Sequence, residues 1–410
     1  MKNQSVLIIA LSRETLTVAR SLGRAGFHVI IGNSGPASVI ESSRYCHEVW
    51  RHPPIEDHLM LESALIGFLD RRPDIRFIFP IGERAPVAIS SMQKILARDI
   101  ILVMVQPPLL DNCLNKSAAN EMAVKLDFNV PQFSEVQSIG EIQSFIDKAE
   151  LPIILKPCRS TKKIVGRKAY ILSTQEEFET AFREWPPDHT HLIVQQYIEG
   201  NIEGCDFVAS DGKLVGYFEA ESLRTDLPDG TGFSVELCSL PISPDVLSAC
   251  RNLVRTYRYS GAGLMQFIRS KRNNRLYFIE INPRLSAGIS QAVACGQNFP
   301  LLTLKAFSPQ FKHELEEVDE SNRLYQINQK THWLQGDIEG LLAQRFNLSL
   351  KEKLRWLFKL LVSFVSADGH MNWTLTDPLP SIKIYWGLCL RLFKRLSMRS
   401  KSIRTPQSDN

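Results

Sequence analysis

The chain has 410 residues, enough for two or three domains with a sizeable core. Its 44% hydrophobic and 22% charged residues are ordinary for a soluble globular protein, and its net charge of +4 is too small to indicate nucleic-acid binding. No apolar run of about 18 residues predicts a membrane span, and no signal-peptide pattern opens the chain. The eight cysteines lack metal-binding spacing, so we expect reduced thiols in a cytoplasmic protein.

The N-terminal residues predict an α/β domain. Residues 5–11 form a continuous apolar run, which is typical of a buried parallel strand. Helical periodicity follows over residues 15–26, and residues 28–32 read as a second strand. This β-α-β unit is typical of an α/β domain with a parallel sheet, and the missing G-x-G-x-x-G pattern argues against dinucleotide binding.

The most informative stretch is 263–284, which reads as two strands joined by a charged turn at residues 270–275. Because side chains alternate faces along a strand, Glu280 and Asn282 should point the same way. Gln266 lies on the neighbouring strand and can join them. One carboxylate and two amide oxygens make an oxygen-only site, suited to Mg²⁺ on nucleotide phosphates. An isolated E-x-N would more simply be a solvated strand end, but the full pattern is more specific.

This pattern, F-I-E-I-N-P-R after a hairpin, resembles the metal-binding signature of the ATP-grasp superfamily. The Gln … Glu-x-Asn version resembles its carbamoyl-phosphate synthase large-subunit and carboxylate–amine ligase branch. The resemblance implies ATP with Mg²⁺ (or Mn²⁺) as cofactors, held by Gln266, Glu280 and Asn282. It also implies a catalytic role for Arg284, in contact with the transferred phosphoryl group or the acyl-phosphate.

The resemblance runs from about residue 5 to residue 310 and implies an α/β and α+β fold. A Rossmann-like domain is expected over 1–110, and an ATP-grasp domain of two α+β subdomains over 111–310. Residues 311–410 are expected to form a C-terminal extension, mostly helical, with a basic tail that is disordered over 396–410.

Two lysines match nucleotide-binding positions of that family. Lys116 opens a helix after Asn115, where the family usually has Asp, and is expected near the ATP phosphates. Lys156 ends an apolar strand, where a buried cation is costly unless it meets an anion. The loop that follows, residues 159–168, departs from the family because it has a single glycine, so hydroxyls and cationic side chains are expected to cover the phosphates.

A hinge between the two subdomains is expected to bind the nucleoside. Its edge should pair with adenine through Gln195, Gln196, Tyr197 and Ile198. Glu203 matches the glutamate that binds the ribose hydroxyls in the family.

Two positions are candidates for the substrate side. Arg224 is a candidate clamp for a substrate carboxylate, because a guanidinium binds a carboxylate with two hydrogen bonds. Ser286 opens a small-residue turn into a helix, whose backbone N–H groups can hold an anion.

These assignments predict an ATP-dependent carboxylate–amine ligase that acts through an acyl-phosphate, with a small-molecule carboxylate and amine as substrates. One alternative is carbamoyl-phosphate or carboxylase-type use of bicarbonate. Another is a non-catalytic, ATP-binding, membrane-associated factor. A homodimer is compatible with each of them, and no nucleic-acid partner is expected.

The C-terminal residues add a possible surface contact. Residues 350–366 carry an amphipathic helical pattern, and residues 391–404 hold six Lys or Arg between apolar residues. Such a segment predicts weak peripheral contact with an anionic membrane, on its inner face. The alternative is a helical extension packed on the catalytic body.

Overall fold

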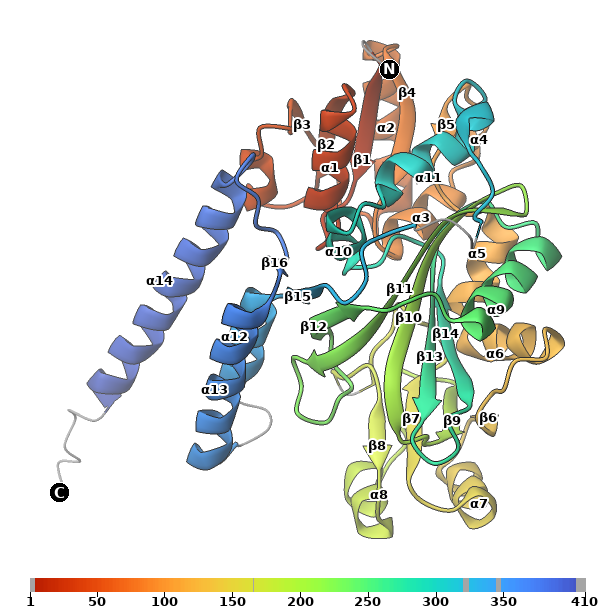
Figure 1. The fold of residues 1–410 in the computed structure, drawn as a ribbon, viewed down its shortest axis with the longest axis vertical. Helices are drawn as coiled ribbons and strands as arrows, with labels where there is room; N and C mark the ends of the chain where they lie inside the picture. The colour runs from red at the N-terminus through yellow and green to blue at the C-terminus, as the bar shows by residue number, and fades with distance from the viewer. Residues whose placement is uncertain (1–3, 165, 320–323, 344–347, 403–410) are drawn as a thin grey trace.

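A five-stranded parallel sheet forms the N-terminal domain of the computed structural model, which describes residues 4–164, 166–319, 324–343 and 348–402 (Figure 1). In sheet order its strands are β3 (Glu48–Arg51), β2 (His28–Asn33), β1 (Ser5–Ile9), β4 (Ile75–Pro80) and β5 (Ile101–Leu102). Its helices are α1 (Thr15–Arg24), α2 (His58–Arg71), α3 (Arg84–Ser90) and α4 (Gln93–Leu96). The central strand β1 is buried throughout, because neighbours on both edges and helices cover it. The predicted parallel α/β domain is confirmed.

A four-stranded antiparallel sheet follows in the chain. Helices α5 (Pro107–Leu114) and α6 (Lys116–Lys125) lead to it. In sheet order its strands are β6 (Phe133–Val136), β9 (Leu192–Gln196), β7 (Ile153–Pro157) and β8 (Tyr170–Leu172), and its helices are α7 (Ile139–Ala149) and α8 (Gln175–Ala181). These elements have a small apolar core of their own, so they form a compact subdomain.

A seven-stranded sheet lies between the N-terminal domain and the small subdomain (Figure 1). In sheet order its strands are β14 (Leu276–Asn282), β13 (Gly261–Ser270), β10 (Gly200–Ser210), β11 (Lys213–Thr225), β12 (Ser234–Ser239), β15 (Lys330–His332) and β16 (Gly369–His370). Helices α9 (Pro244–Thr256), α10 (Ile289–Ala294) and α11 (Phe299–Phe307) accompany it. Its largest buried side chains belong to the same core cluster as those of the N-terminal domain, which fixes the two units together.

The C-terminal extension is helical, as predicted, but it also contributes strands. Its helices are α12 (Leu334–Leu342), α13 (Leu350–Ser366) and α14 (Leu379–Ser402). Strand β15 pairs antiparallel with β12, and β16 continues the sheet, so the extension shares the hydrogen-bonding of the large sheet. Disorder from residue 396 is wrong as far as Ser402, because α14 continues through residues that favour helix. Residues 403–410 lie outside the described residues.

The segment before α14 returns to the N-terminal domain. Arg20 Nε on α1 lies 2.8 Å from Asp377 Oδ2, and both side chains are buried. Ser43 Oγ and the Arg44 backbone N–H also donate to the Asp377 carboxylate, at 2.6 and 3.0 Å. The extension is therefore attached both to the large sheet and to the N-terminal domain. In the described part of the chain, no helix is long and apolar enough to cross a bilayer.

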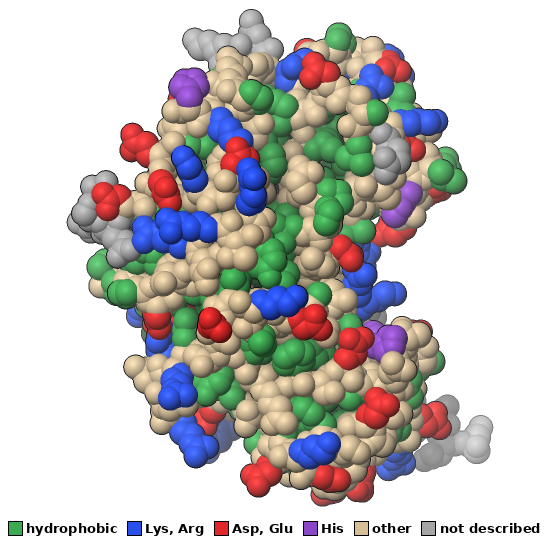
Figure 2. Space-filling view, turned by 90° about the vertical axis from the view of Figure 1, so that its right-hand side faces the viewer, with side chains coloured by type: hydrophobic (Ala, Val, Ile, Leu, Met, Phe, Trp, Pro, Cys, Tyr) green, Lys and Arg blue, Asp and Glu red, His purple; other side chains and the backbone are tan. Residues whose placement is uncertain are grey.

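Charged side chains are mixed on the surface. On the face shown in Figure 2, Lys and Arg side chains are interspersed with Asp and Glu side chains. This distribution accords with the small net charge and does not favour a polyanionic partner.

Candidate functional site

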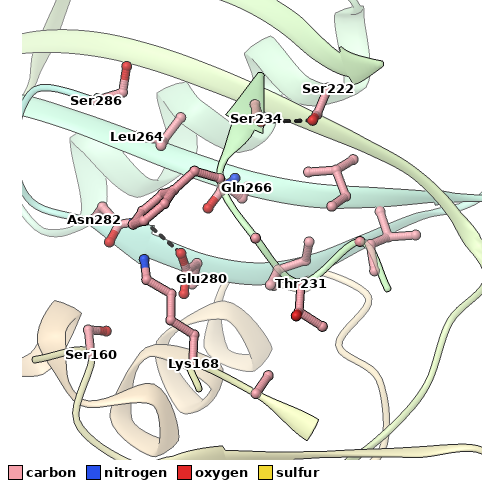
Figure 3. Close-up of a pocket in the computed structure, with 18 of the residues that line it drawn as sticks. Ser160, Lys168, Ser222, Thr231, Ser234, Leu264, Gln266, Glu280, Asn282 and Ser286 are labelled. Atoms are coloured by element: carbon pink, nitrogen blue, oxygen red, sulfur yellow. Dashed lines mark hydrogen bonds between the residues drawn. The ribbon is translucent and has the colours of Figure 1, made fainter. Parts of the chain in front are cut away.

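A cavity of about 390 Å³ lies between the four-stranded and seven-stranded sheets. Figure 3 shows Gln266, Glu280 and Asn282 on one side of it, with Lys168 and Ser160 reaching in from the other. Part of the wall is apolar and is formed by Ile154, Ile171, Ile202, Leu264, Ile268 and Phe278. An apolar slot beside convergent polar groups is a common form of a small-molecule site.

The predicted hairpin is confirmed, and it brings the three candidate metal ligands together. Strands β13 and β14 pair antiparallel, with Gln266 directly opposite Glu280. Asn282 follows two residues later and donates from Nδ2 to Glu280 Oε1 at 2.9 Å. All three line the cavity, and this leaves amide and carboxylate oxygens for a hard cation.

Glu280 is held in its anionic form. Burial would raise the pKa of its carboxyl, but the nearby Lys116 and Lys168 and the Asn282 hydrogen bond bring it well below its usual range. Lys116 Nζ lies 3.1 Å from Glu280 Oε2 and 2.9 Å from Ser160 Oγ. The described residues contain no cluster of three or more His, Cys, Asp or Glu side chains that could hold a metal. A metal ion here would therefore need the amide oxygens of Gln266 and Asn282 and oxygens of a bound ligand in addition to the Glu280 carboxylate.

Lys156 is the most buried cation of the site, with 8% of its surface exposed. Its Nζ donates to Gln195 Oε1 at 2.9 Å. Burial lowers the pKa of Lys156 to about 8, with a further decrease from Lys116. No carboxylate oxygen of a described residue lies within 4 Å of it, unlike Lys116. An unpaired buried cation that lines a cavity fits an anionic ligand such as a phosphate.

The predicted hinge residues Gln195, Gln196, Tyr197 and Ile198 all line the cavity. The glycine-poor loop contributes Arg159, Ser160, Lys162 and Lys168 to the same cavity. The candidate phosphate and adenine positions are therefore brought together. Their ligand roles stay predictions.

Glu203, which was expected to bind the ribose hydroxyls, points away from the cavity. Its neighbours Ile202 and Gly204 line the cavity, so strand alternation places Glu203 on the opposite face of β10. There Arg269 Nε lies 2.7 Å from Glu203 Oε1, and Arg269 Nη2 lies 2.9 Å from its Oε2.

Arg224, which was expected to be a substrate clamp, also lies outside the cavity lining. A β-bulge after Ser222 turns Arg224 to the face opposite the cavity. Arg224 Nη1 donates to Asp337 Oδ1 at 2.7 Å, and its Nε lies 3.5 Å from Glu236 Oε2. Its charge is neutralised by carboxylates of this protein and is not offered to a substrate.

Arg284 and Ser286 line the end of the cavity nearest the N-terminal domain. Arg284 Nη2 donates to Glu83 Oε1, 2.9 Å away in the loop after β4. Burial alone would lower the pKa of Arg284, but the Glu83 and Glu14 carboxylates raise it, so the guanidinium stays charged. Ser286 Oγ donates to Asp206 Oδ2 at 3.0 Å.

Sequence reasoning missed four charged residues that line the cavity, Arg13, Glu83, Asp206 and Asp229. The Arg13 guanidinium lies 4.0 Å from the Phe233 ring centroid and 4.3 Å from that of Trp333. Burial lowers the pKa of Arg13 to about 10. Its position after the first parallel strand could have indicated it, because ligands bind at the carboxyl ends of such strands. Asp206, in a strand of apolar residues, is a buried charge that strand periodicity could have indicated.

The fold and the cavity define the class of protein. An N-terminal parallel sheet precedes two further sheets that enclose lysines on one side and an oxygen-only ligand set on the other. Residues 188–332 match the family model described as ATP-grasp in the biosynthetic pathway with Ter operon, so this part of the chain is similar to ATP-grasp domains.

Known proteins agree with this class. The mitochondrial carbamoyl phosphate synthase arginine-specific large chain of Schizosaccharomyces pombe is 22% identical over 290 residues, which are 66% of this chain and 23% of that protein. The chain thus spans less than a quarter of that relative.

Two solved structures share the fold. The ADP complex of purK, N5-carboxyaminoimidazole ribonucleotide synthetase, has a TM-score of 0.64 at 13% identity and covers 88% of this chain and 97% of that chain. The L-amino acid ligase from Bacillus licheniformis has a TM-score of 0.57 at 15% identity and covers 78% of each chain.

Proposed function

We propose that this protein is an ATP-dependent carboxylate–amine ligase that cleaves Mg-ATP to ADP and phosphate. The carrying observation is the cavity-facing pair Gln266 and Glu280, with Asn282 beside them and the buried Lys156 across the cavity. This donor set suits a divalent cation that is also bound by phosphate oxygens. The L-amino acid ligase and synthetase structures that share the fold support the choice of reaction.

Each of the following candidate site residues has a defined part in this proposal. Lys116 and Lys156 bind phosphate oxygens, and residues 195–198 bind adenine. Gln266, Glu280 and Asn282 hold Mg²⁺, which neutralises charge on the phosphates when bound. Arg284 stabilises the transferred phosphoryl group and the negative charge that develops on oxygen.

The reaction takes place in two steps. A substrate carboxylate oxygen attacks the γ-phosphorus of ATP, and ADP leaves, which gives an acyl-phosphate. The amine nitrogen then attacks the acyl carbon, the bond to the phosphate oxygen breaks, and an amide forms. The protein supplies positioning and charge neutralisation, since phosphoryl transfer needs little covalent help.

A screen of ADP release tests the proposal. Purified protein is incubated with Mg-ATP and a panel of amino acids, short peptides and sugar acids, with and without an amine or hydroxylamine. We expect ADP and phosphate only when a suitable carboxylate is present, and no release from a Glu280→Gln variant. ADP release with bicarbonate alone would favour the carboxylase-type alternative. ATP binding without turnover on any substrate would favour a non-catalytic factor.

A peripheral membrane contact is a second proposal, and the surface of α13 favours it. Eight large apolar side chains of this helix are exposed: Leu350, Leu354, Leu357, Phe358, Leu361, Val362, Phe364 and Val365. At about 3.6 residues per turn they form one continuous stripe. Leu360 and Ser363 are buried on the opposite face, where Ser363 Oγ donates to Glu236 Oε2 at 2.7 Å.

The charged residues beside this apolar stripe indicate the kind of surface that it contacts. The exposed cations Lys351, Lys353, Arg355 and Lys359 flank it, with Glu352 as the exposed acid. An apolar stripe bordered by cations fits an anionic bilayer surface, in which the helix lies parallel to the membrane. Self-association as a homodimer and a cytoplasmic location stay predictions.

A further inference from the structure

Four carboxylates line the cavity: Glu83, Asp206, Asp229 and Glu280. Three of them have a cation of this protein as a partner. Lys116 lies 3.1 Å from Glu280, Arg284 lies 2.9 Å from Glu83, and Arg167 lies 3.8 Å from Asp229. Asp206 has no Lys, Arg or His nitrogen within 4 Å among the described residues.

Asp206 is also incompletely hydrogen-bonded. The residue is 9% exposed, and its Oδ2 accepts a hydrogen bond from Ser286 Oγ at 3.0 Å. Its Oδ1 is buried and has no hydrogen-bond partner in the described structure. A buried polar atom left unpaired costs about 1–3 kcal/mol, and more when charged. Burial accordingly raises the pKa of Asp206 to about 7.

The strand register places Asp206 beside the candidate phosphate site. Asp206 pairs with Leu264 on β13, and Leu264 pairs with Asn282 on β14. Asp206 and Asn282 are thus two strand spacings apart, about 10 Å, on the cavity face of one sheet. The row before them contains Gly204, Gln266 and Glu280. Asp206 therefore lies level with Asn282 and beyond Gln266 and Glu280, towards Ser286 and the N-terminal domain.

We propose that Asp206 and Ser286 form the subsite of the amine substrate and bind it as a protonated primary amine. The inference rests on the proposed ligase function and adds the class of its second substrate. An ammonium group supplies the cation that Asp206 lacks and donates to the unpaired Oδ1. The positive charge of the nearby Arg284 lowers the pKa of Asp206 and so favours the carboxylate form that an ammonium group needs.

Asp206 has a chemical part in the second step as well. The ammonium transfers one proton to the Asp206 carboxylate, which leaves a neutral amine with a free electron pair. That pair forms the C–N bond with the acyl carbon, and the C–O bond to phosphate breaks, with its electron pair leaving on phosphate. The second proton leaves the nitrogen with the departing phosphate, and Asp206 returns its proton to solvent.

Two nucleophiles test the subsite, with a carboxylate that the wild-type screen has identified. Hydroxylamine is neutral at pH 8 and needs no carboxylate partner, whereas methylammonium is cationic. For Asp206→Asn we expect kcat/KM for methylammonium to fall by about ten- to hundredfold, the equivalent of losing a charged hydrogen bond. Hydroxylamine-dependent ADP release should stay within about twofold, because the activation step does not use Asp206.

Glu219→Gln is the matched control, because Glu219 is a fully buried carboxylate outside the cavity, hydrogen-bonded to Tyr217 and Ser243. It should not distinguish the two nucleophiles. Equal losses with both nucleophiles in Asp206→Asn, or no loss with either, would overturn the amine subsite. No ADP release or hydroxamate from wild-type protein with any carboxylate would overturn the ligase function itself, and the subsite with it.

Discussion

Lys116 Nζ and Glu280 Oε2 lie 3.1 Å apart, so the lysine predicted to bind phosphates neutralises the carboxylate predicted to bind metal. The two groups come from α6 and β14, which are 164 residues apart in the chain. Because these two charges are in contact, we expect nucleotide binding and metal binding to be electrostatically coupled. A change at either residue should therefore alter both binding events.

Glu280→Gln should abolish Mg-dependent ADP formation. The substitution keeps the shape of the side chain but removes the only charge among the three proposed metal ligands. Steady-state ADP release at saturating Mg²⁺ measures the loss, and Glu199→Gln, at an exposed carboxylate, is the control. ADP formation near the wild-type rate would show that Glu280 does not hold the metal.

Lys156→Met should weaken ATP binding by about 1.5–3 kcal/mol, the range for hydrogen bonds to charged groups. In the wild type, the pKa of Lys156 is lowered to about 8, so its charge is present at pH 7 and lost as the pH rises through that value. A bound phosphate favours the charged form, and affinity should therefore fall between about pH 7 and pH 9. Calorimetry should show this fall in the wild type and a smaller one in the variant. An identical slope in both would assign the effect to another group.

Arg284→Ala should slow the chemical step by about 10²–10³ and leave ATP affinity nearly unchanged. Its guanidinium lies at the Ser286 end of the cavity, beyond the metal ligands. Because the variant also leaves Glu83 without its cation, Arg284→Ala combined with Glu83→Gln separates catalysis from stability. Rapid-quench measurement of ADP formation, beside calorimetry for ATP, gives the two values. Parallel losses of affinity and rate would indicate a ground-state role.

Phe358→Ser with Val365→Ser should weaken binding to vesicles that contain phosphatidylglycerol. Both side chains are exposed, by 68% and 82%, so the fold should be unaffected. Leu59→Ser on α2 removes an equally exposed apolar side chain elsewhere and serves as the control. Co-sedimentation at low and high salt measures binding, which should decrease as salt screens the flanking cations. Failure of the wild type to sediment at low salt would exclude the membrane contact.

Asp377→Ala should lower the free energy of unfolding by about 3–5 kcal/mol, the cost of leaving a buried charge without its partner. Arg20 would lose its carboxylate while remaining buried between α1 and the C-terminal segment. Urea denaturation followed by fluorescence measures the change. A loss below 1 kcal/mol would mean that water or the Asn372 carbonyl compensates for the missing carboxylate.

The sequence predicts this site well where the information is local. The spacing of Gln266, Glu280 and Asn282 depends only on strand alternation and one hairpin, and the structure has that register. Glu203 and Arg224 were misplaced because each depends on which face a side chain occupies. For Arg224 that face changes at a bulge after Ser222, which the sequence does not reveal.

Long-range contacts account for the rest. Arg13 lines the cavity because the end of β1 approaches the large sheet, and whether Asp206 has a cation beside it depends on residues that are distant in the sequence. The strands of the C-terminal extension are three and two residues long, too short for a periodic signal.

The bond between Arg20 and Asp377 has a consequence for the order of assembly during synthesis. Arg20 leaves the ribosome 357 residues before its buried partner. The N-terminal sheet can form before that partner is made, since its last strand ends at Leu102. Arg20 then stays hydrated until Asp377 has emerged. A nascent chain that stops before Asp377 would carry every candidate site residue and still lack the contact between α1 and the segment before α14.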